Sequence, residues 1–330
     1  MGWSAIWGQE NRADSLIESA TEIAEGILIQ EIDTSYIRSY SNRLSLRLLA
    51  FNKYNNIRFF DNSLSNSIRY RPDLGVNLGI GFVYKWFALD ISANPGINED
   101  NIASSKYRDI QARVLTMNHY LRARYQYYYG YKIDNLSDDV LNLNGNQGIR
   151  TDIRTIQIGL QYLYVFNYGK FSLKSSFVMS ERQKKSAGSF LAGGGFHMYI
   201  MDADSSVIPR NTELFSDTRS YFTQMNIGTL FASFGYMYTI SLGEHFFITV
   251  SLIPGLGIKS GDYRIDKLVP IEPSFMFRTK TMNAFGYNSR RFFMGLQLVA
   301  NHMYMPLEKD LRCSILEGRA SLYIGYRFKM

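Results

Sequence analysis

The feature that most constrains this fold is a two-residue alternation of apolar and polar side chains, repeated along most of the chain. It is clearest within residues 157–190, where every second residue from Ile156 to Phe166 is apolar. The positions between them include glutamine and glycine. A period of two with one apolar face indicates a β-strand whose two sides meet unlike surroundings.

A second alternating run follows this strand. Asn167, Tyr168 and Gly169 interrupt the pattern, which resumes from Phe171 to Met179. Two such runs joined by an Asn/Gly turn predict a β-hairpin. Each run has the ~9–11 residues that a tilted membrane-spanning strand needs.

The same unit recurs from Arg43 to the C-terminus. Further strands are expected at 43–51, 74–84, 87–93, 108–117, 119–131, 189–201, 226–240, 246–252, 274–287, 290–304 and 314–330. In 119–131, the odd-numbered residues from Leu121 to Tyr131 are expected to face lipid, with Arg122, Arg124 and Gln126 inward. The pattern predicts an all-β protein, a single antiparallel transmembrane β-barrel of about 12–14 strands.

Composition agrees with a membrane barrel. No run approaches the ~20 apolar residues of a membrane helix. Aromatic residues make up 15% of the chain, with 24 Tyr and 22 Phe, which suits aromatic girdles at the two membrane interfaces. A soluble β-sandwich or small-molecule barrel is the alternative, but many of the runs exceed the ~5–6 residues usual for soluble strands.

The N-terminal region has a different character. Residues 1–8 (MGWSAIWG) read as a signal-peptide remnant or as a tagged or truncated start. Residues 9–41 form an acidic segment, with seven acids and one base between residues 9 and 33. Within it, residues 10–30 carry apolar side chains at helical spacing and predict a short helix. The barrel is expected over 42–330.

Four stretches carry a family resemblance: DTSYIRSYSNRLSLRL (33–48), IRYRPDLGVNLGIGFVYKW (68–86), YQYYYGY (125–131) and YVFNYGKFSLKSSFVMSERQKKSAGSFLAGGGF (164–196). They resemble the domain of unknown function 4421 family, typical of Bacteroidetes-type bacteria. The resemblance implies an outer-membrane β-barrel and brings no activity or site residue with it.

An outer-membrane location in a Gram-negative cell envelope sets the expected partners. These are outer-membrane lipid, lipopolysaccharide and, during biogenesis, the barrel-assembly machinery. Nucleic acid is excluded as a partner because the bases are spread along alternating strands, with no basic helix or stacking platform.

The inward faces of the strands are rich in bases. The expected basic lining of the lumen is Arg43, Arg47, Arg113, Arg122, Arg124, Lys174, Arg278, Lys280, Arg319 and Arg327. Asp90, Asp109 and Glu317 are the inward acids. Buried charges must be paired or solvated, so either the lumen is wet or the acidic segment 10–33 docks against these bases.

A polar cluster lies between the two strands at 164–196. Its members are Arg182, Gln183, Lys184, Lys185 and Ser186, preceded by Glu181. It could bind an anionic head group or a partner loop. It could equally be a solvated turn, as charge runs usually are.

The sequence predicts no catalytic, metal or cofactor site. One cysteine, Cys313, excludes a disulfide framework. No nucleophile is recognisable beside the four histidines, although strand register could still pair one with a serine. The run Gly193-Gly194-Gly195 lacks the helix and Lys-Ser/Thr of a phosphate loop. We therefore expect no enzyme, with a lipid-modifying hydrolase as the minor alternative.

Two functions remain open at this stage. One is a porin-like pore whose basic lumen favours small anionic solutes. The other is a filled barrel, a structural or interaction component of the envelope that presents loops 132–151 and 202–225. The turns are not consistent with strict alternation: those at 84–87, 117–119 and 167–169 fall on one side and those at 241–244 and 286–290 on the other. Either 202–225 hides a strand or one strand is wrongly assigned.

Overall fold

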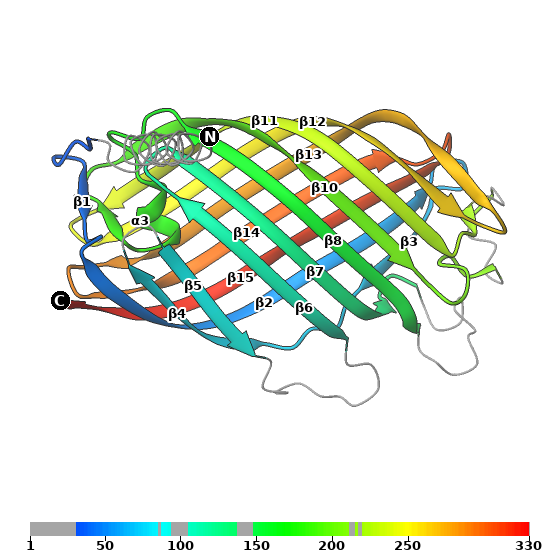
Figure 1. Cartoon of the computed structure of the whole chain (residues 1–330), viewed down its shortest axis with the longest axis horizontal. Coiled ribbons are helices and arrows are strands. Elements are labelled where there is room, and N and C mark those ends of the chain that lie inside the picture. The colour runs from blue at the N-terminus through cyan, green and yellow to red at the C-terminus, as the bar shows by residue number, and fades with distance from the viewer. Residues whose placement is uncertain are drawn as a thin grey trace, which may run out of the picture.

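A computed structural model describes residues 31–84, 87–93, 105–136, 148–210, 215–216 and 220–329. The helix expected in residues 10–30 and the remnant expected in residues 1–8 lie outside these ranges. The long strands are antiparallel and form one closed β-barrel, as the alternating pattern predicts (Figure 1).

The elements follow one another in chain order. The strands and the one described helix are β1 (Ile37–Ser39), β2 (Arg43–Asp61), β3 (Asn66–Arg71), β4 (Asn77–Tyr84), β5 (Phe87–Ala93), β6 (Lys106–Leu115), β7 (His119–Ile133), β8 (Ile149–Val165), α3 (Leu173–Phe177), β9 (Glu181–Gln183), β10 (Ala187–Asp202), β11 (Gln224–Leu242), β12 (Phe246–Arg264), β13 (Leu268–Asn288), β14 (Phe292–Pro306) and β15 (Leu311–Lys329). We call the end where β2 begins and β15 ends the terminal end, and the opposite end the loop end.

Ten strands close the ring at the loop end. They are β2, β3, β7, β8 and β10–β15, with β15 paired to β2 along its whole length. β2 is long enough to pair with β3 near the loop end and with β4 near the terminal end. β4 then pairs with β5, and β6 with β7. The expected 12–14 strands therefore correspond to a 13-stranded sheet of which ten strands form the closed ring.

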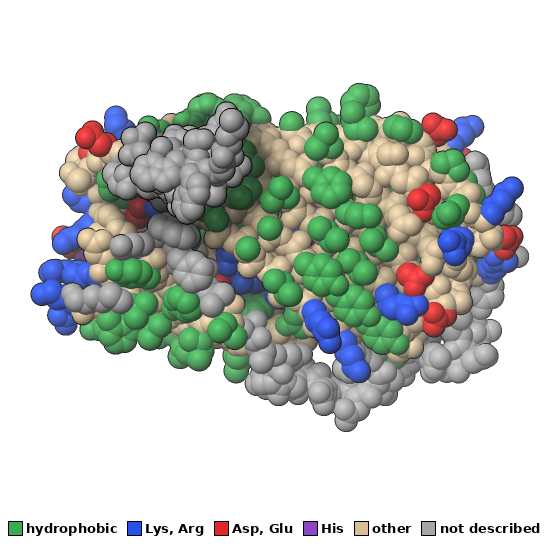
Figure 2. Space-filling view, in the orientation of Figure 1, with side chains coloured by type: hydrophobic (Ala, Val, Ile, Leu, Met, Phe, Trp, Pro, Cys, Tyr) green, Lys and Arg blue, Asp and Glu red, His purple; other side chains and the backbone are tan. Residues whose placement is uncertain are grey.

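The outer face of the wall carries an apolar band toward the terminal end. On β2, Leu46 and Leu48 are exposed, whereas the outward residues beyond Ala50 are mostly polar: Asn52, Asn56 and Arg58, with Tyr54 and Phe60 between and after them. Figure 2 shows apolar side chains across the wall and charged side chains gathered toward the ends. Because only apolar side chains are favourable against lipid, the band marks the membrane level and the loop-end part of the barrel extends beyond it.

The prediction that Phe171–Met179 forms the second strand of a hairpin is wrong. Residues 166–186, which we call the terminal-end plug, turn into the lumen and contain the short helix α3 (Figure 1). β8 pairs directly with β10. Phe171, Leu173 and Phe177 are buried inside the barrel rather than exposed to lipid. Alternation alone could not reveal this, because a segment enclosed by a barrel is also apolar.

This correction removes the inconsistency among the turns. With one strand fewer before β10, the turns at 116–118, 243–245 and 289–291 all lie at the terminal end. The error was therefore an extra strand within 166–186, and 202–225 hides none among its described residues.

Side chains of the wall hold the terminal-end plug by its backbone carbonyls. Asn288 Nδ2 donates to Ser175 O at 3.2 Å and to Glu181 O at 2.9 Å. Arg327 Nε donates to Met179 O at 3.0 Å. β1, the strand that begins at Ile37, also pairs with β9 of this plug. These bonds satisfy carbonyls that burial removes from water.

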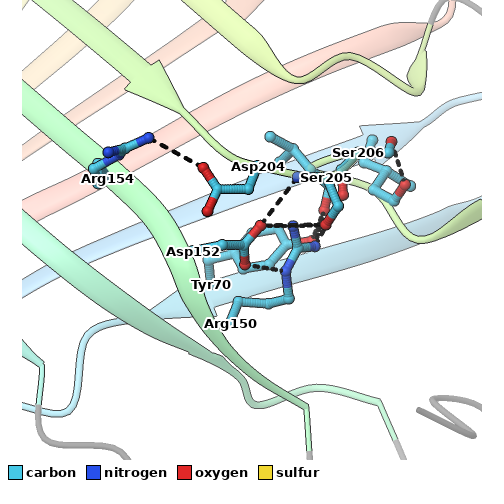
Figure 3. Close-up of polar contacts among 9 residues, drawn as sticks. Tyr70, Arg150, Asp152, Arg154, Asp204, Ser205 and Ser206 are labelled. Carbon is cyan, nitrogen blue, oxygen red and sulfur yellow. Dashed lines mark hydrogen bonds and ion pairs between the residues drawn. The ribbon is translucent and has the colours of Figure 1, made fainter.

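A second plug closes the loop end. Its described residues are 203–210, 215–216 and 220–223, and Val207, Ile208 and Phe222 are buried in a cluster with the loop-end wall. Arg150 Nη1 donates to Ser206 O at 2.9 Å and to Val207 O at 3.0 Å (Figure 3). We call these residues the loop-end plug. Part of the expected outer loop 202–225 therefore folds inward.

The same network fixes the orientation of Arg150. Asp152 accepts two hydrogen bonds from its guanidinium, each 2.8 Å long, and Ser205 Oγ accepts a third at 2.9 Å. The Tyr70 hydroxyl donates to Val207 O. Figure 3 shows these side chains converging on the plug backbone from β3 and β8. A bidentate Arg–carboxylate pair restricts the guanidinium to one geometry.

A β-bulge at Gly130 reverses the inward–outward alternation in the last part of β7. The pairing of β7 with β8 shifts between Tyr129 and Tyr131, and Gly130 between them has a φ of +85°. This bulge turns Tyr131 inward, where its hydroxyl lies 2.6 Å from Thr155 Oγ1. The expectation that Tyr131 faces lipid is therefore wrong. An extra residue in a strand reverses the alternation that follows it.

The carbonyl contacts of Asn288 predict a large loss of stability in Asn288→Ala. The change leaves Ser175 O and Glu181 O without this buried donor, so we expect the free energy of unfolding to fall by about 2–4 kcal/mol. Urea unfolding of the protein in lipid vesicles would measure it. Asn62→Ala, at an exposed position in the turn after β2, is the matched control and should change the value by less than about 0.5 kcal/mol. Equal effects of the two variants would contradict the anchoring role.

Asp61 predicts a pH dependence of the loop-end plug. It ends β2 beyond the apolar band, and its carboxylate accepts hydrogen bonds from Ser216 N at 2.7 Å and Ser63 N at 2.8 Å. Burial opposes ionisation, but these hydrogen bonds and those from Leu64 N and the serine hydroxyls lower the pKa of Asp61 to about 2. Because an unfolded aspartate has a pKa of about 3.9, the stabilisation is complete above that pH and is lost as the pH falls toward 2.

We therefore expect Asp61→Asn to destabilise the protein by about 1–2 kcal/mol at neutral pH. The difference from wild type should shrink between about pH 4 and pH 2. Urea unfolding at several pH values measures both quantities. Asp310→Asn, in a turn at the same end of the barrel, is the control. A difference between wild type and Asp61→Asn that stays constant down to pH 2 would contradict the assignment.

Candidate functional site

A layer of charged side chains lies between the two plugs, at the level of the apolar band. It surrounds a cavity of about 70 Å³. We call this cavity and its charged lining the basic chamber. Its lining includes Arg47 and Lys53 from β2, Asp109, Gln111 and Arg113 from β6, Arg122 and Arg124 from β7, Asn301 from β14, and Glu317 and Arg319 from β15, with Phe177 and Val178 of the terminal-end plug as its floor.

Three acids neutralise part of this charge. Lys53 Nζ lies 2.7 Å from Asp109 Oδ2. Arg124 forms an ion pair with Glu317. Asp90 serves two bases, since its oxygens lie 2.8 Å from Arg47 Nη2 and 3.0 Å from Arg113 Nη2.

The bidentate contact of Asp90 depends on a glycine. Gly81 lies opposite Asp90 in the pairing of β4 with β5. A Cβ added to Gly81 would lie 2.2 Å from Asp90 Oδ1 and 2.7 Å from Arg47 Nε. Only glycine leaves room for these two side chains to meet over the strand.

Four further bases form no ion pair within the described part of the chain: Arg122, Arg278, Lys280 and Arg319. Three of them contact neutral or aromatic groups. Lys280 Nζ donates to Gln161 Oε1 at 2.7 Å. Arg278 Nη2 donates to Asn301 Oδ1 at 2.9 Å, and Arg319 lies 5.2 Å from the centre of the Phe51 ring.

Several guanidinium nitrogens have no hydrogen-bond acceptor. Arg122 Nε, Arg278 Nε and Arg278 Nη1 are buried without a partner among the described protein atoms. A buried cation without a counter-charge is costly. The chamber therefore has both the charge and the free donors that an anionic group requires.

The structure places most of the predicted lumen bases around this chamber. Arg47, Arg113, Arg122, Arg124 and Arg319 line it, and Arg278 and Lys280 lie beside it. Three others lie elsewhere, because they belong to the terminal end: Arg43 donates to Arg290 O at 3.3 Å, Lys174 lies 3.5 Å from Glu181, and Arg327 holds the terminal-end plug. Whether any of these residues binds a solute stays a prediction.

Lys53 was missed by the sequence analysis. The first strand was expected to end at Phe51, whereas β2 continues to Asp61. The inward positions after Phe51 are Lys53, Asn55 and Ile57. Continuing the alternation past Phe51 would have placed Lys53 in the lumen.

The predicted polar cluster 182–186 lies in the terminal-end plug and contacts the segment before β1. Gln183 is buried, and its Oε1 accepts from Ser172 N at 2.9 Å. Lys184 Nζ donates to Thr34 O at 2.8 Å, and Ser186 Oγ accepts from Ser241 N at 2.9 Å. Lys185 Nζ lies 5.2 Å from the centre of the Tyr36 ring. Arg182 lies opposite Arg38 in the strand pairing of β9 with β1. Binding of an anion or partner by this cluster remains a prediction.

Two histidines contact hydroxyl groups on the barrel exterior. His302 Nε2 lies 2.7 Å from Ser314 Oγ, and His119 Nδ1 lies 2.7 Å from Tyr162 Oη. Within the described ranges no carboxylate orients His302, which a serine hydrolase would need. Three-residue groups of metal-ligating side chains and helices able to cross a membrane are likewise absent from these ranges. That the protein is not an enzyme stays a prediction.

Solved structures with a similar arrangement are outer-membrane proteins. The outer membrane protease OmpT from Escherichia coli covers 88% of this chain and 98% of its own, with a TM-score of 0.42 and 7% identity. The translocator domain of the autotransporter NalP from Neisseria meningitidis covers 97% and 98%, with a TM-score of 0.36 and 13% identity. The Pseudomonas putida toluene transporter TodX covers 87% and 91%, with a TM-score of 0.26 and 8% identity. Similarity this low says nothing about activity.

No curated protein matches the chain. A family model does match: that of the domain of unknown function DUF4421, over residues 31–328. The match covers the described barrel from the residues before β1 to the end of β15. This protein therefore belongs to the DUF4421 family of outer-membrane-type β-barrels.

Proposed function

We propose that this protein is a filled barrel of the Gram-negative outer membrane that holds an anionic group in its basic chamber. The observation that carries the proposal is the excess of bases in and beside the basic chamber, where Arg122, Arg278, Lys280 and Arg319 lie outside any ion pair in the described ranges. An anion placed among them would offset the cost of burying these charges.

The two plugs favour a filled barrel over a pore. Both contain buried apolar side chains and are tied to the wall by hydrogen bonds, and the cavity between them measures about 70 Å³. That volume accommodates a few water molecules or one small anion rather than a continuous aqueous path. Because the plugs close opposite ends of the lumen, a pore would require both of them to open.

The orientation in the envelope follows the usual asymmetry of such barrels. Apart from the terminal-end plug 166–186, the connections at the terminal end are short turns, and both barrel termini lie there. The long connections 134–148 and 203–223 lie at the loop end. Bacterial barrels place short turns toward the periplasm and long loops toward the exterior. The loop-end plug would then close the outer opening.

A filled barrel predicts the absence of steady conductance. We expect the refolded full chain in planar bilayers to give no stable single-channel current, because both plugs are anchored inside the wall. Steady anion-selective current from the wild-type protein would contradict this proposal and favour the pore. Asn288→Ala, which loosens only the terminal-end plug, should give no steady current either, because the loop-end plug still closes the barrel.

An occupied chamber predicts that anions stabilise the fold. At a phosphate concentration about tenfold above its Kd, the free energy of unfolding should rise by about 1.4 kcal/mol. The double variant Arg122→Gln/Arg319→Gln should lose this response while remaining at least as stable as wild type without phosphate, because two unpaired buried cations are removed. Urea unfolding in vesicles at constant ionic strength measures both effects.

The control for that measurement is Arg58→Gln. Arg58 lies on the exterior near the loop end, where it donates to Ser67 Oγ at 2.8 Å. It should keep the full response to phosphate. An equal response in all three proteins would show that phosphate acts through general exclusion from the surface and would contradict a specific anion site.

A further inference from the structure

The wall of the barrel has one seam. Within the described residues, every neighbouring pair of wall strands is joined by hydrogen bonds except β5 and β6. In Figure 1 these two strands run apart on the near face of the barrel. The β3–β7 pairing closes the wall on the loop-end side of the seam. Each strand therefore presents an unpaired edge toward the seam.

The seam lies at the level of the membrane. The exterior residues of the two bordering strands include Ile91 on β5 and Ile110 on β6, which are 66% and 69% exposed. Val114 continues the same apolar face toward the terminal end. Unpaired backbone groups are strongly disfavoured in hydrocarbon, so a seam at this level suits an occupant that has both polar and apolar parts.

The seam opens onto the basic chamber. Asp109, Gln111 and Arg113 of β6 face inward and line the cavity. An ion pair between Asp90 and Arg113 links the two strands. The Arg113 side chain is 28% exposed, whereas that of Arg47, on the other side of Asp90, is 2% exposed. Figure 2 shows basic side chains recessed in the wall here, beside apolar ones.

We propose that the chamber receives the anionic head group of a membrane amphiphile, which enters sideways from the bilayer through the β5–β6 seam. This inference rests on the proposed anion-holding function and names the class of ligand. Arg113 stands at the entrance, and Arg122 and Arg319 surround the space beyond it. The cavity of about 70 Å³ fits a phosphate or carboxylate group.

The alkyl chains of the ligand remain outside the wall. They lie along the apolar face formed by Ile91, Ile110 and Val114, which is continuous with the lipid-facing band. This position covers the seam from the lipid side, and the head group supplies an acceptor for the unpaired Nε donor of Arg122, which lines the chamber. A freely soluble anion would satisfy the chamber but would leave the seam uncovered.

A photoreactive ligand would test lateral entry. The wild-type protein is refolded into phosphatidylcholine vesicles that contain dodecyl phosphate with a photoreactive group at the end of its chain. We expect the label to be concentrated on peptides from β6, as located by mass spectrometry. A dodecyl glucoside carrying the same photoreactive group controls for ordinary lipid contact and should label all wall strands evenly.

Variants connect that label to the chamber. Arg113→Gln/Arg319→Gln should reduce labelling of β6 by about tenfold, the effect of losing charged hydrogen bonds to the head group. Arg58→Gln should leave it unchanged, and Arg113→Lys should retain much of it. If the double variant does not fold, unlabelled dodecyl phosphate should still suppress wild-type labelling at far lower total concentration than inorganic phosphate.

The outcomes separate the two proposals. Stabilisation by phosphate together with even labelling of the wall would overturn lateral entry and keep a chamber filled from water. Labelling of β6 that persists in the double variant would also overturn it, because the seam would then bind chains without a head-group site. Absence of any response to phosphate or to dodecyl phosphate would overturn the anion-holding function itself.

Discussion

The pairing of β15 with β2 is the interaction on which the rest of this structure depends. It joins the last strand of the chain to the first long one over their full lengths and leaves no free edge at that junction. In a bilayer, backbone groups find no water, so a sheet is tolerated only when it closes on itself. Closure creates an interior, and the interior must then be filled or solvated. In this protein the two plugs fill most of the interior, and the basic chamber lies between them.

The interior is arranged in layers according to polarity. Apolar clusters fill the barrel next to each plug, and the charged layer lies between them. The plugs are bound mainly through backbone carbonyls, which accept from Asn288, Gln297 and Arg150. Such bonds depend on where the backbone lies rather than on plug side chains, so the wall residues that donate them determine how the plugs are seated.

Much of the fold could be predicted from the sequence, because lipid on one side and protein on the other impose a period of two. The lipid-facing set of β15, including Leu322, Ile324 and Tyr326, is confirmed, as are the inward positions of Arg122 and Arg124. The terminal-end plug could not be recognised, since Phe171–Met179 alternates like a strand although it lies inside. The partners of the chamber bases depend on strand register, which brings Arg124 to Glu317 across 193 positions. Local pattern carries no such information.

The division of one wall strand into β3 and β4 also gives the barrel a taper. The loop end is bounded by ten strands, whereas the terminal end has β4, β5 and β6 in the place that β3 alone occupies. At ~4.8 Å per strand, the two additional strands lengthen the perimeter by about 10 Å. The wider end is the one that admits a helical turn, α3, within the wall. A sheet that widens along its axis has to end its extra strands somewhere inside the membrane, and here this leaves the unpaired seam. The widening that makes room for α3 therefore also produces the seam.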